Sequence, residues 1–219
     1  MNNHDFPNIR GDPEKKKHRI KTKQLTNLSN TLSGKDRQIL IFLQSCKYAY
    51  SEHIRNLFYT DSASVSTASR AANRTTKKLK ELGLIQSVGR QIGGRGSGST
   101  SFIWYLTELG YRVIGLENGT ESRKRVVVPS LVFIRHTLSI TETYTQIVKA
   151  ISASSSVKIQ KVEWEPECWR IVNKNRKETS LRPDLYLETI NGEYEDRWFI
   201  EVDLDTEDIG TVCTKCRRY

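Results

Sequence analysis

The spacing of apolar residues in the first half of the chain predicts three successive helices. Apolar residues recur at helical spacing over residues 34–46, and Ser33 before them is suited to cap a helix N-terminus. A shorter helix is expected from Tyr50. A third is expected over residues 65–82, with Gly83 in the position that commonly follows a helix C-terminus. The third helix is expected to turn a set of small and apolar residues inward, namely Ala68, Ala71, Ala72, Thr75, Leu79 and Leu82.

A β-hairpin with a long tip is predicted to follow the third helix. Residues 84–88 and 101–106 have strand-like composition, and residues 89–100 between them are rich in Gly, Arg and Ser. A further short helix is expected from Thr107. Three helices followed by a hairpin is the order of a winged helix-turn-helix, so we expect that fold over residues 33–116.

The remainder of the chain has a mixed pattern of helix and strand. After a linker at residues 117–130, helical spacing predicts one long helix over residues 131–152. The dipeptide Asn191-Gly192 is typical of a tight hairpin turn. The chain is therefore expected to be α+β, with a second α/β module over residues 131–219, and this module is truncated if Tyr219 interrupts a helix. The predicted strands are 157–164, 169–172, 185–189 and 197–204.

The first 32 residues are expected to form a flexible basic arm. They are polar, are interrupted by Pro7, Gly11 and Pro13, and contain the run Lys15–Arg19. The arm is either a solvated tail or a segment that touches a DNA backbone. Three tryptophans of the second module are expected in its core, namely Trp164, Trp169 and Trp198.

Charge separates the two halves of the chain, which has a formal net charge of +10. Residues 1–130 hold 22 Lys and Arg against 10 Asp and Glu, a net of +12, and residues 131–219 hold 13 against 15, a net of −2. A basic module gains affinity for nucleic acid by releasing counterions. No helix combines a Trp or Phe face with a Lys face, which disfavours a membrane surface as partner.

The sequence shows neither a membrane-spanning segment nor a signal peptide. No apolar run reaches the roughly 18 residues of a membrane-spanning helix. The N-terminus lacks the apolar core of a signal peptide. We therefore expect a cytoplasmic protein with reduced thiols. Cys213 and Cys216 have the spacing of zinc ligands but are more simply two thiols on a helix.

The third predicted helix carries the residues expected to read DNA. Arg70, Asn73, Arg74 and Lys77 have the spacing i, i+3, i+4 and i+7, so they share one face. Arg and Asn side chains form specific hydrogen bonds with base edges in the major groove. Asn73 and Arg74 are therefore the predicted base contacts.

Other basic residues are expected to hold the DNA backbone. Lys77, Lys78 and Lys80 lie on the outward side of the helix and are suited to phosphates. Arg90 and Arg95 lie among the glycines of the hairpin tip, which allow a close approach to DNA. The alternative interpretation is a solvated basic helix face beside a loop.

Carboxylates gather in the second module. Asp184 begins one predicted strand, and Glu201, Asp203 and Asp205 alternate along another, so they would share one face of it. Such oxygen ligands suit Mg²⁺ or Mn²⁺, which could activate water against a phosphodiester. The predicted metal ligands are Asp184, Glu201 and Asp203. Otherwise these residues are exposed edge acids or are paired with the nearby arginines, Arg182, Arg217 and Arg218.

A series of short motifs runs through the second module. Pro183-Asp184 is followed by Phe199-Ile200-Glu201-Val202-Asp203, then by Thr206-Glu207, and then by Lys215 and Tyr219. With the winged-helix pattern over Leu32–Ile114 and the stretch His136-Thr137-Leu138, this series resembles the plasmid replication-relaxation proteins of bacteria. The resemblance covers roughly residues 33–219. It implies a winged helix joined to a restriction-endonuclease-like module, and a role in plasmid replication and DNA relaxation.

A looser similarity to nucleases of that fold implies a catalytic set. Their core has Pro-Asp on one strand and Glu-x-Lys on the next, which Asp184 and Glu201 match, with Glu142 as the helix carboxylate. Asp203 occupies the position of the lysine, which helps to position water and offset charge. Lys215 would then supply this group from the following helix, or the site is inactive. His136 is interpreted as a packed or capping residue.

Three functions are therefore open from the sequence. The first is a DNA-binding protein of plasmid replication and relaxation, the second a metal-dependent nicking endonuclease, and the third a winged-helix transcription regulator. The expected partner is double-stranded DNA, plasmid DNA in particular. A homodimer is an open possibility, and no membrane partner is expected.

Overall fold

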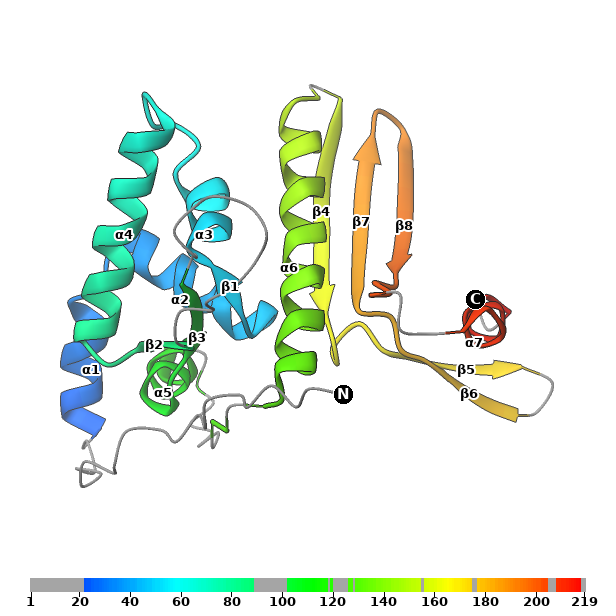
Figure 1. Cartoon of the computed structure of the whole chain (residues 1–219), viewed down its shortest axis with the longest axis horizontal. Helices are drawn as coiled ribbons and strands as arrows, with labels where there is room; N and C mark the ends of the chain where they lie inside the picture. The colour runs from blue at the N-terminus through cyan, green and yellow to red at the C-terminus, as the bar shows by residue number, and fades with distance from the viewer. Residues whose placement is uncertain are drawn as a thin grey trace, which may run out of the picture.

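The computed structural model is a mixed α+β protein (Figure 1). The structure describes residues 22–88, 102–117, 119, 126–127, 129–154, 156–174, 177–204 and 208–217. The helices are α1 (Thr22–Asn30), α2 (Gly34–Cys46), α3 (Ser51–Phe58), α4 (Val65–Glu81), α5 (Glu108–Glu117), α6 (Leu131–Ser152) and α7 (Ile209–Cys216). The strands are β1 (Ala49–Tyr50), β2 (Ile85–Val88), β3 (Ile103–Leu106), β4 (Val157–Trp164), β5 (Arg170–Lys174), β6 (Lys177–Leu181), β7 (Leu185–Asn191) and β8 (Tyr194–Ile200).

The first half of the chain packs helices around a small antiparallel sheet with the strand order β1-β3-β2. The predicted helices and the hairpin strands are present there, and the two-residue strand β1 between α2 and α3 is an addition. Ser33 caps α2 as expected, because its hydroxyl accepts from Asp36 N–H at 3.1 Å. The Asp36 carboxylate accepts in return from Ser33 N–H at 2.8 Å. This reciprocal pair satisfies two N–H groups that the first turn of a helix leaves without partners.

Helix α1 corrects the prediction of a flexible arm over residues 1–32. Thr22–Asn30 is helical, Leu25 is fully buried, and Leu28 packs against the core. Leu32, just beyond the helix, is buried as well. Leu25 and Leu28 are three residues apart and share one face of the helix, and burying that face outweighs the polar composition of the segment. The run Lys15–Arg19 lies outside the described residues.

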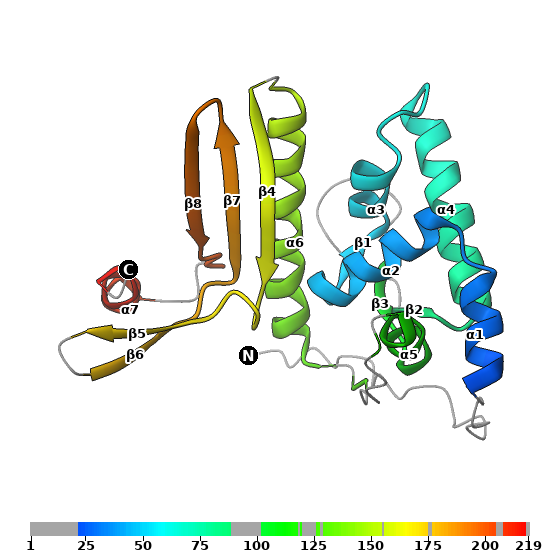
Figure 2. The ribbon, with the colours of Figure 1, turned by 180° about the vertical axis from the view of Figure 1, so that it is seen from behind.

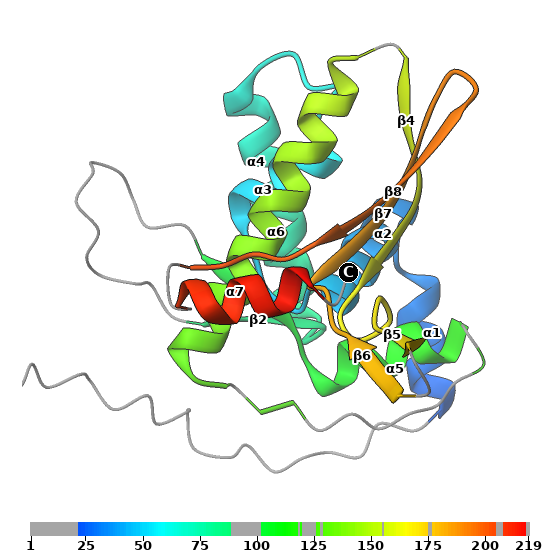
Figure 3. The ribbon, with the colours of Figure 1, turned by 90° about the vertical axis from the view of Figure 1, so that its right-hand side faces the viewer.

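The second half places α6 between a three-stranded antiparallel sheet and the helices of the first half (Figures 1 and 2). The sheet has the order β4-β7-β8, and β5 and β6 form a separate hairpin. Helix α7 lies at the same end of the sheet as that hairpin (Figures 1 and 3). The strand expected over residues 197–204 is wrong in its bounds. The turn at Asn191-Gly192 starts β8 at Tyr194, and β8 ends at Ile200 because its partner β7 begins opposite it, at Leu185.

One cluster of buried side chains extends through both halves of the chain. It includes Leu43 of α2, Ile140 of α6 and Leu185 of β7. Within it, the Trp164 ring lies 6.2 Å from Phe42 and 5.0 Å from Tyr144, measured between centroids. The two halves are therefore held by common apolar burial. The domain boundary at residues 117–130 stays a prediction.

The tryptophans differ from expectation. Trp164 is buried as predicted, but Trp169 is 40% exposed and Trp198 is 52% exposed, so neither belongs to the core. Trp198 lies on the edge strand β8, where few neighbours cover it, and its indole N–H donates to Thr189 Oγ1 at 3.0 Å. Among the described helices, none has the length and apolar character needed to cross a membrane.

Candidate functional site

Helix α4 turns small residues inward and polar residues outward. Ala68, Ala72, Thr76 and Leu79 are buried against the rest of the first half. Thr75, which was expected inward, is half-buried, and its Oγ1 accepts from the Tyr59 hydroxyl at 2.6 Å. The predicted DNA-binding residues of the helix are all exposed: Arg70, Asn73, Arg74, Lys77, Lys78 and Lys80.

The arginines of this face have no protein partner in the described part of the chain. Neither the Arg70 nor the Arg74 guanidinium forms an ion pair or hydrogen bond with another described residue. Lys77 lies 3.9 Å from Glu81, an exposed pair one helical turn away that contributes little to stability. The predicted contacts Arg90 and Arg95 lie outside the described residues.

Lys78 has a different environment from the other cations of α4. Its Nζ lies 2.6 Å from Oδ2 of Asp36, whose side chain is almost completely buried at the start of α2. Burial would raise the pKa of Asp36, but hydrogen bonds from Lys78 and from Ser33 outweigh this effect and lower it. Lys78 therefore holds α4 against α2, a role that the spacing of residues did not indicate.

Asp184 is a buried carboxylate that directly precedes β7, the central strand of the β4-β7-β8 sheet. Its Oδ2 accepts from Val202 N–H at 2.7 Å, and its Oδ1 lies 3.1 Å from His136 Nε2. The carboxylate thus joins α6 to the segment that follows β8. His136 is packed and hydrogen-bonded, in agreement with the prediction for this residue.

Glu201 and Lys215 lie beside this carboxylate. Asp184 N–H donates to the carbonyl of Ile200 at 3.0 Å, which brings Glu201 next to Asp184. The Lys215 Nζ from α7 lies 3.5 Å from Glu201 Oε2. Glu201 and Asp203 are exposed while Val202 and Leu204 are half-buried, so the predicted alternation holds although these residues are not in a strand. Asp205 lies outside the described residues.

A family model of replication-relaxation proteins matches residues 40–219. The chain belongs to the replication-relaxation family. The resemblance inferred from the motif series is therefore confirmed, and the membership supports a role in plasmid replication and relaxation. No curated protein and no solved structure matches the chain.

Glu142 of this replication-relaxation protein does not join Asp184 as the nuclease comparison implied. Its Oε2 lies 2.8 Å from Nε2 of His53, and its Oε1 accepts from Gln146 at 2.5 Å. His53 is buried on α3, and its Nδ1 accepts from Tyr50 N–H at 3.2 Å. His53 was not among the functional residues predicted from the sequence. Its position three residues after Tyr50, where a side chain can reach back to the start of a helix, is the one local signal for it.

The predicted metal ligands of the replication-relaxation protein are not assembled. Over the part of the chain that the structure describes, no three His, Cys, Asp or Glu side chains are grouped to hold a metal ion. Both oxygens of Asp184 are already bound to protein groups. In this arrangement Asp184, Glu201 and Asp203 are not grouped as metal ligands, and Cys213 and Cys216 are two exposed thiols on α7.

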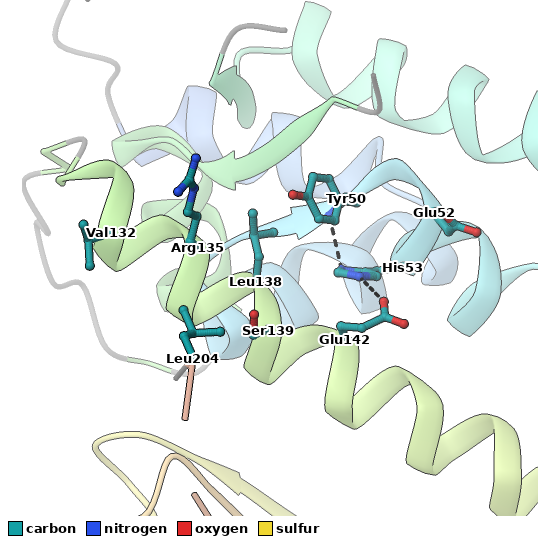
Figure 4. Close-up of a pocket in the computed structure, with 9 residues that line it drawn as sticks. All are labelled: Tyr50, Glu52, His53, Val132, Arg135, Leu138, Ser139, Glu142 and Leu204. Atoms are coloured by element: carbon teal, nitrogen blue, oxygen red, sulfur yellow. Dashed lines mark hydrogen bonds and ion pairs between the residues drawn. The ribbon is translucent and has the colours of Figure 1, made fainter. Parts of the chain in front are cut away.

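A cavity of about 740 Å³ lies where α3, α6 and the segment after β8 meet (Figure 4). It combines polar and apolar walls, and no residue of α4 lines it. Figure 4 shows the Tyr50 hydroxyl directed towards Arg135, with the His53–Glu142 pair further along the cavity. The residues that line it include Tyr50, His53, Arg135, Leu138, Ser139 and Glu142.

Proposed function

We propose that this replication-relaxation protein binds double-stranded DNA, plasmid DNA in particular, through a winged helix-turn-helix. The observation that carries the proposal is the exposed face of α4, on which the guanidinium groups of Arg70 and Arg74 form no ion pair with other described residues. Cations without protein partners are available to phosphates and base edges. The net charge of +12 over residues 1–130 adds a long-range attraction to a polyanion.

The connectivity of the first half supports this interpretation. Residues 59–64 connect α3 to α4, and the hydrogen bond from the Tyr59 hydroxyl to Thr75 links the end of α3 to α4. β2 and β3 form an antiparallel hairpin directly after α4, and β1 completes the sheet. Helix α4 lies at an outer side of the molecule, away from the β4-β7-β8 sheet (Figures 1 and 2). A duplex can therefore approach it.

In this proposal α4 is the recognition helix. An α-helix fits the major groove of B-form DNA, where side chains reach the base edges. Asn73 and Arg74 then contact bases, and Lys77 and Lys80 contact phosphates. Lys78 contributes through Asp36, because this ion pair sets the position of α4 on the rest of the module.

Fluorescence anisotropy with a labelled duplex, titrated across salt, tests the proposal. Affinity is expected to fall linearly with salt on logarithmic axes, and Lys77→Ala to reduce that slope by about 1. Arg74→Ala is expected to cost about 1–3 kcal/mol of binding free energy. Lys158→Ala, an exposed cation on β4, is the matched control. Binding that does not weaken with salt, or equal losses in the Arg74 and Lys158 variants, contradicts the proposal.

One observation favours a second candidate, a nicking endonuclease. The comparison with nucleases implied a catalytic set of five residues. Three of them, Asp184, Glu201 and Lys215, are neighbours in the structure. Incubation of supercoiled plasmid with Mg²⁺ or Mn²⁺ tests it, with Glu201→Gln as the variant because Glu201 is exposed. Nicking that Glu201→Gln abolishes supports this candidate. The absence of nicking, or nicking at an unchanged rate, removes it.

A further inference from the structure

The cavity between α3 and α6 is of a size and composition suited to a ligand. Its volume of about 740 Å³ falls in the range of pockets that hold small organic molecules. Leu138 forms a buried apolar wall, and Val132 and Leu204 extend that wall. Polar side chains from α6 itself and from the β1–α3 segment also line it, so the cavity offers both an apolar surface and hydrogen-bonding groups. Such mixed walls suit a ligand that is planar and apolar on its faces and polar at its edges.

Arg135 supplies a cation at this cavity. Its side chain is exposed, and it has no hydrogen bond or ion pair within the described ranges. Figure 4 shows the Tyr50 hydroxyl directed towards Arg135, whose positive charge offsets part of the rise in the pKa of Tyr50 caused by burial. A guanidinium beside a hydroxyl is a good receptor for a phosphate, because both groups donate hydrogen bonds to its oxygens.

Glu142 supplies an acceptor at a fixed position. Gln146 and His53 each donate to one of its oxygens, yet the side chain is 49% exposed. Each carboxylate oxygen has a further acceptor site, which is open to a donor in the cavity. The amino and imino groups at the edge of a nucleobase are such donors. Ser139, between Arg135 and Glu142 on α6, adds a hydroxyl to the same wall.

We propose that this cavity binds one nucleotide of an unpaired DNA strand. The phosphate contacts Arg135 and the Tyr50 hydroxyl, the base lies on the apolar wall at Leu138, and its edge donates to Glu142. A base within a duplex is stacked and paired and cannot enter, so the cavity selects unpaired strands. The proposal goes beyond duplex binding by α4 and does not depend on it, because no α4 residue lines the cavity.

Binding of a labelled single-stranded oligonucleotide tests the assignment. Arg135→Gln is expected to weaken this binding about tenfold, the effect of one charge-assisted contact. Lys149→Gln removes the same charge further along α6 and is expected to change it less than about twofold. Duplex binding is expected to be unaffected by Arg135→Gln, whereas Arg74→Ala is expected to reduce it. Equal losses in the Arg135 and Lys149 variants, or no loss in either, overturn the proposal.

A steric variant and a competition experiment complete the test. Ser139→Phe fills the cavity without changing charge and is expected to weaken single-strand binding while a thermal melt shows that the protein remains folded. Unchanged single-strand binding by folded Ser139→Phe overturns the proposal. A deoxynucleoside monophosphate is expected to compete with the oligonucleotide better than inorganic phosphate does. Equal competition by the two overturns the base contact, and monophosphate binding without oligonucleotide binding overturns the assignment to a DNA strand.

Discussion

His53 on α3 and Glu142 on α6 are joined by a hydrogen bond of 2.8 Å between Nε2 and Oε2. Because His53 Nδ1 accepts from the Tyr50 N–H, the proton of the neutral ring is on Nε2, where it is donated to Glu142. This bond fixes the tautomer of the histidine. It also joins the helices of the first half to the long helix of the second.

The stability of the protein is expected to fall as the pH drops below about 6.5. Burial lowers the pKa of His53 from its ordinary value of 6.5, against the opposing effect of Glu142. The unfolded state therefore takes up a proton first, and stability present above that pH is lost as pH falls through the folded-state pKa. The loss is at most about 1.4 kcal/mol per pH unit. Urea unfolding at about pH 7.5 and about pH 5.5 measures it.

Two variants assign this pH dependence to the pair. His53→Gln is expected to remove the part of the loss that belongs to this histidine. Glu142→Gln is expected to increase the loss of stability at low pH, because this variant lacks the carboxylate that favours the protonated ring. If both variants keep the dependence of the wild-type protein, the His53–Glu142 pair is not its source.

Lys78→Ala is expected to destabilise the fold, unlike the neighbouring Lys80→Ala. Loss of Lys78 leaves the buried Asp36 carboxylate without its ion-pair partner, at a cost of about 1–2 kcal/mol given the partial exposure of the lysine. Lys80 is exposed, and its replacement is expected to cost less than about 0.5 kcal/mol. Free energies of unfolding from urea titrations distinguish the two. Equal values would show that the Asp36 contact contributes nothing.

Asp184→Ala is expected to cost about 2–3 kcal/mol, because it leaves the N–H of Val202 and the ring of His136 without their acceptor. Asp184→Asn is expected to cost about 1 kcal/mol, since the amide oxygen still accepts from Val202. The difference between the two variants in chemical denaturation is the diagnostic quantity. If Asp184 had only a catalytic role, Asp184→Ala and Asp184→Asn would have the same stability.

Gly110 on α5 is expected to tolerate no side chain. A Cβ at this position would lie 2.2 Å from the carbonyl oxygen of Leu84, so the helix would have to move away from β2. Gly110→Ala is expected to destabilise the protein by more than about 2 kcal/mol. Gly34→Ala is the control, because a Cβ there meets nothing within 4 Å. Melting temperatures compare the two, and similar values would refute the close approach of α5.

Elements with strong local signals could be predicted from the sequence, and elements that depend on pairing could not. The cap at Ser33 and the long helices followed from short-range spacing. Helix α1 was missed because its two leucines, Leu25 and Leu28, stand among polar residues. The end of β8 was misplaced because it depends on where β7 begins, which is a property of the pairing. The motif series around Asp184 was specific enough to indicate the family.

The sequence by itself determined the amphipathic helices and the basic face of α4, since these follow from a helical period that neighbouring residues share. Only the tertiary structure decided which charged residues have partners. Lys78 and Asp36 are 42 residues apart, His136 and Asp184 are 48 apart, and His53 and Glu142 are 89 apart. Each pair forms because packing brings distant segments within hydrogen-bond distance, and local spacing carries no record of that contact. Arg70, Arg74 and Arg135 remain available for ligands because packing assigns them no such partner among the described residues.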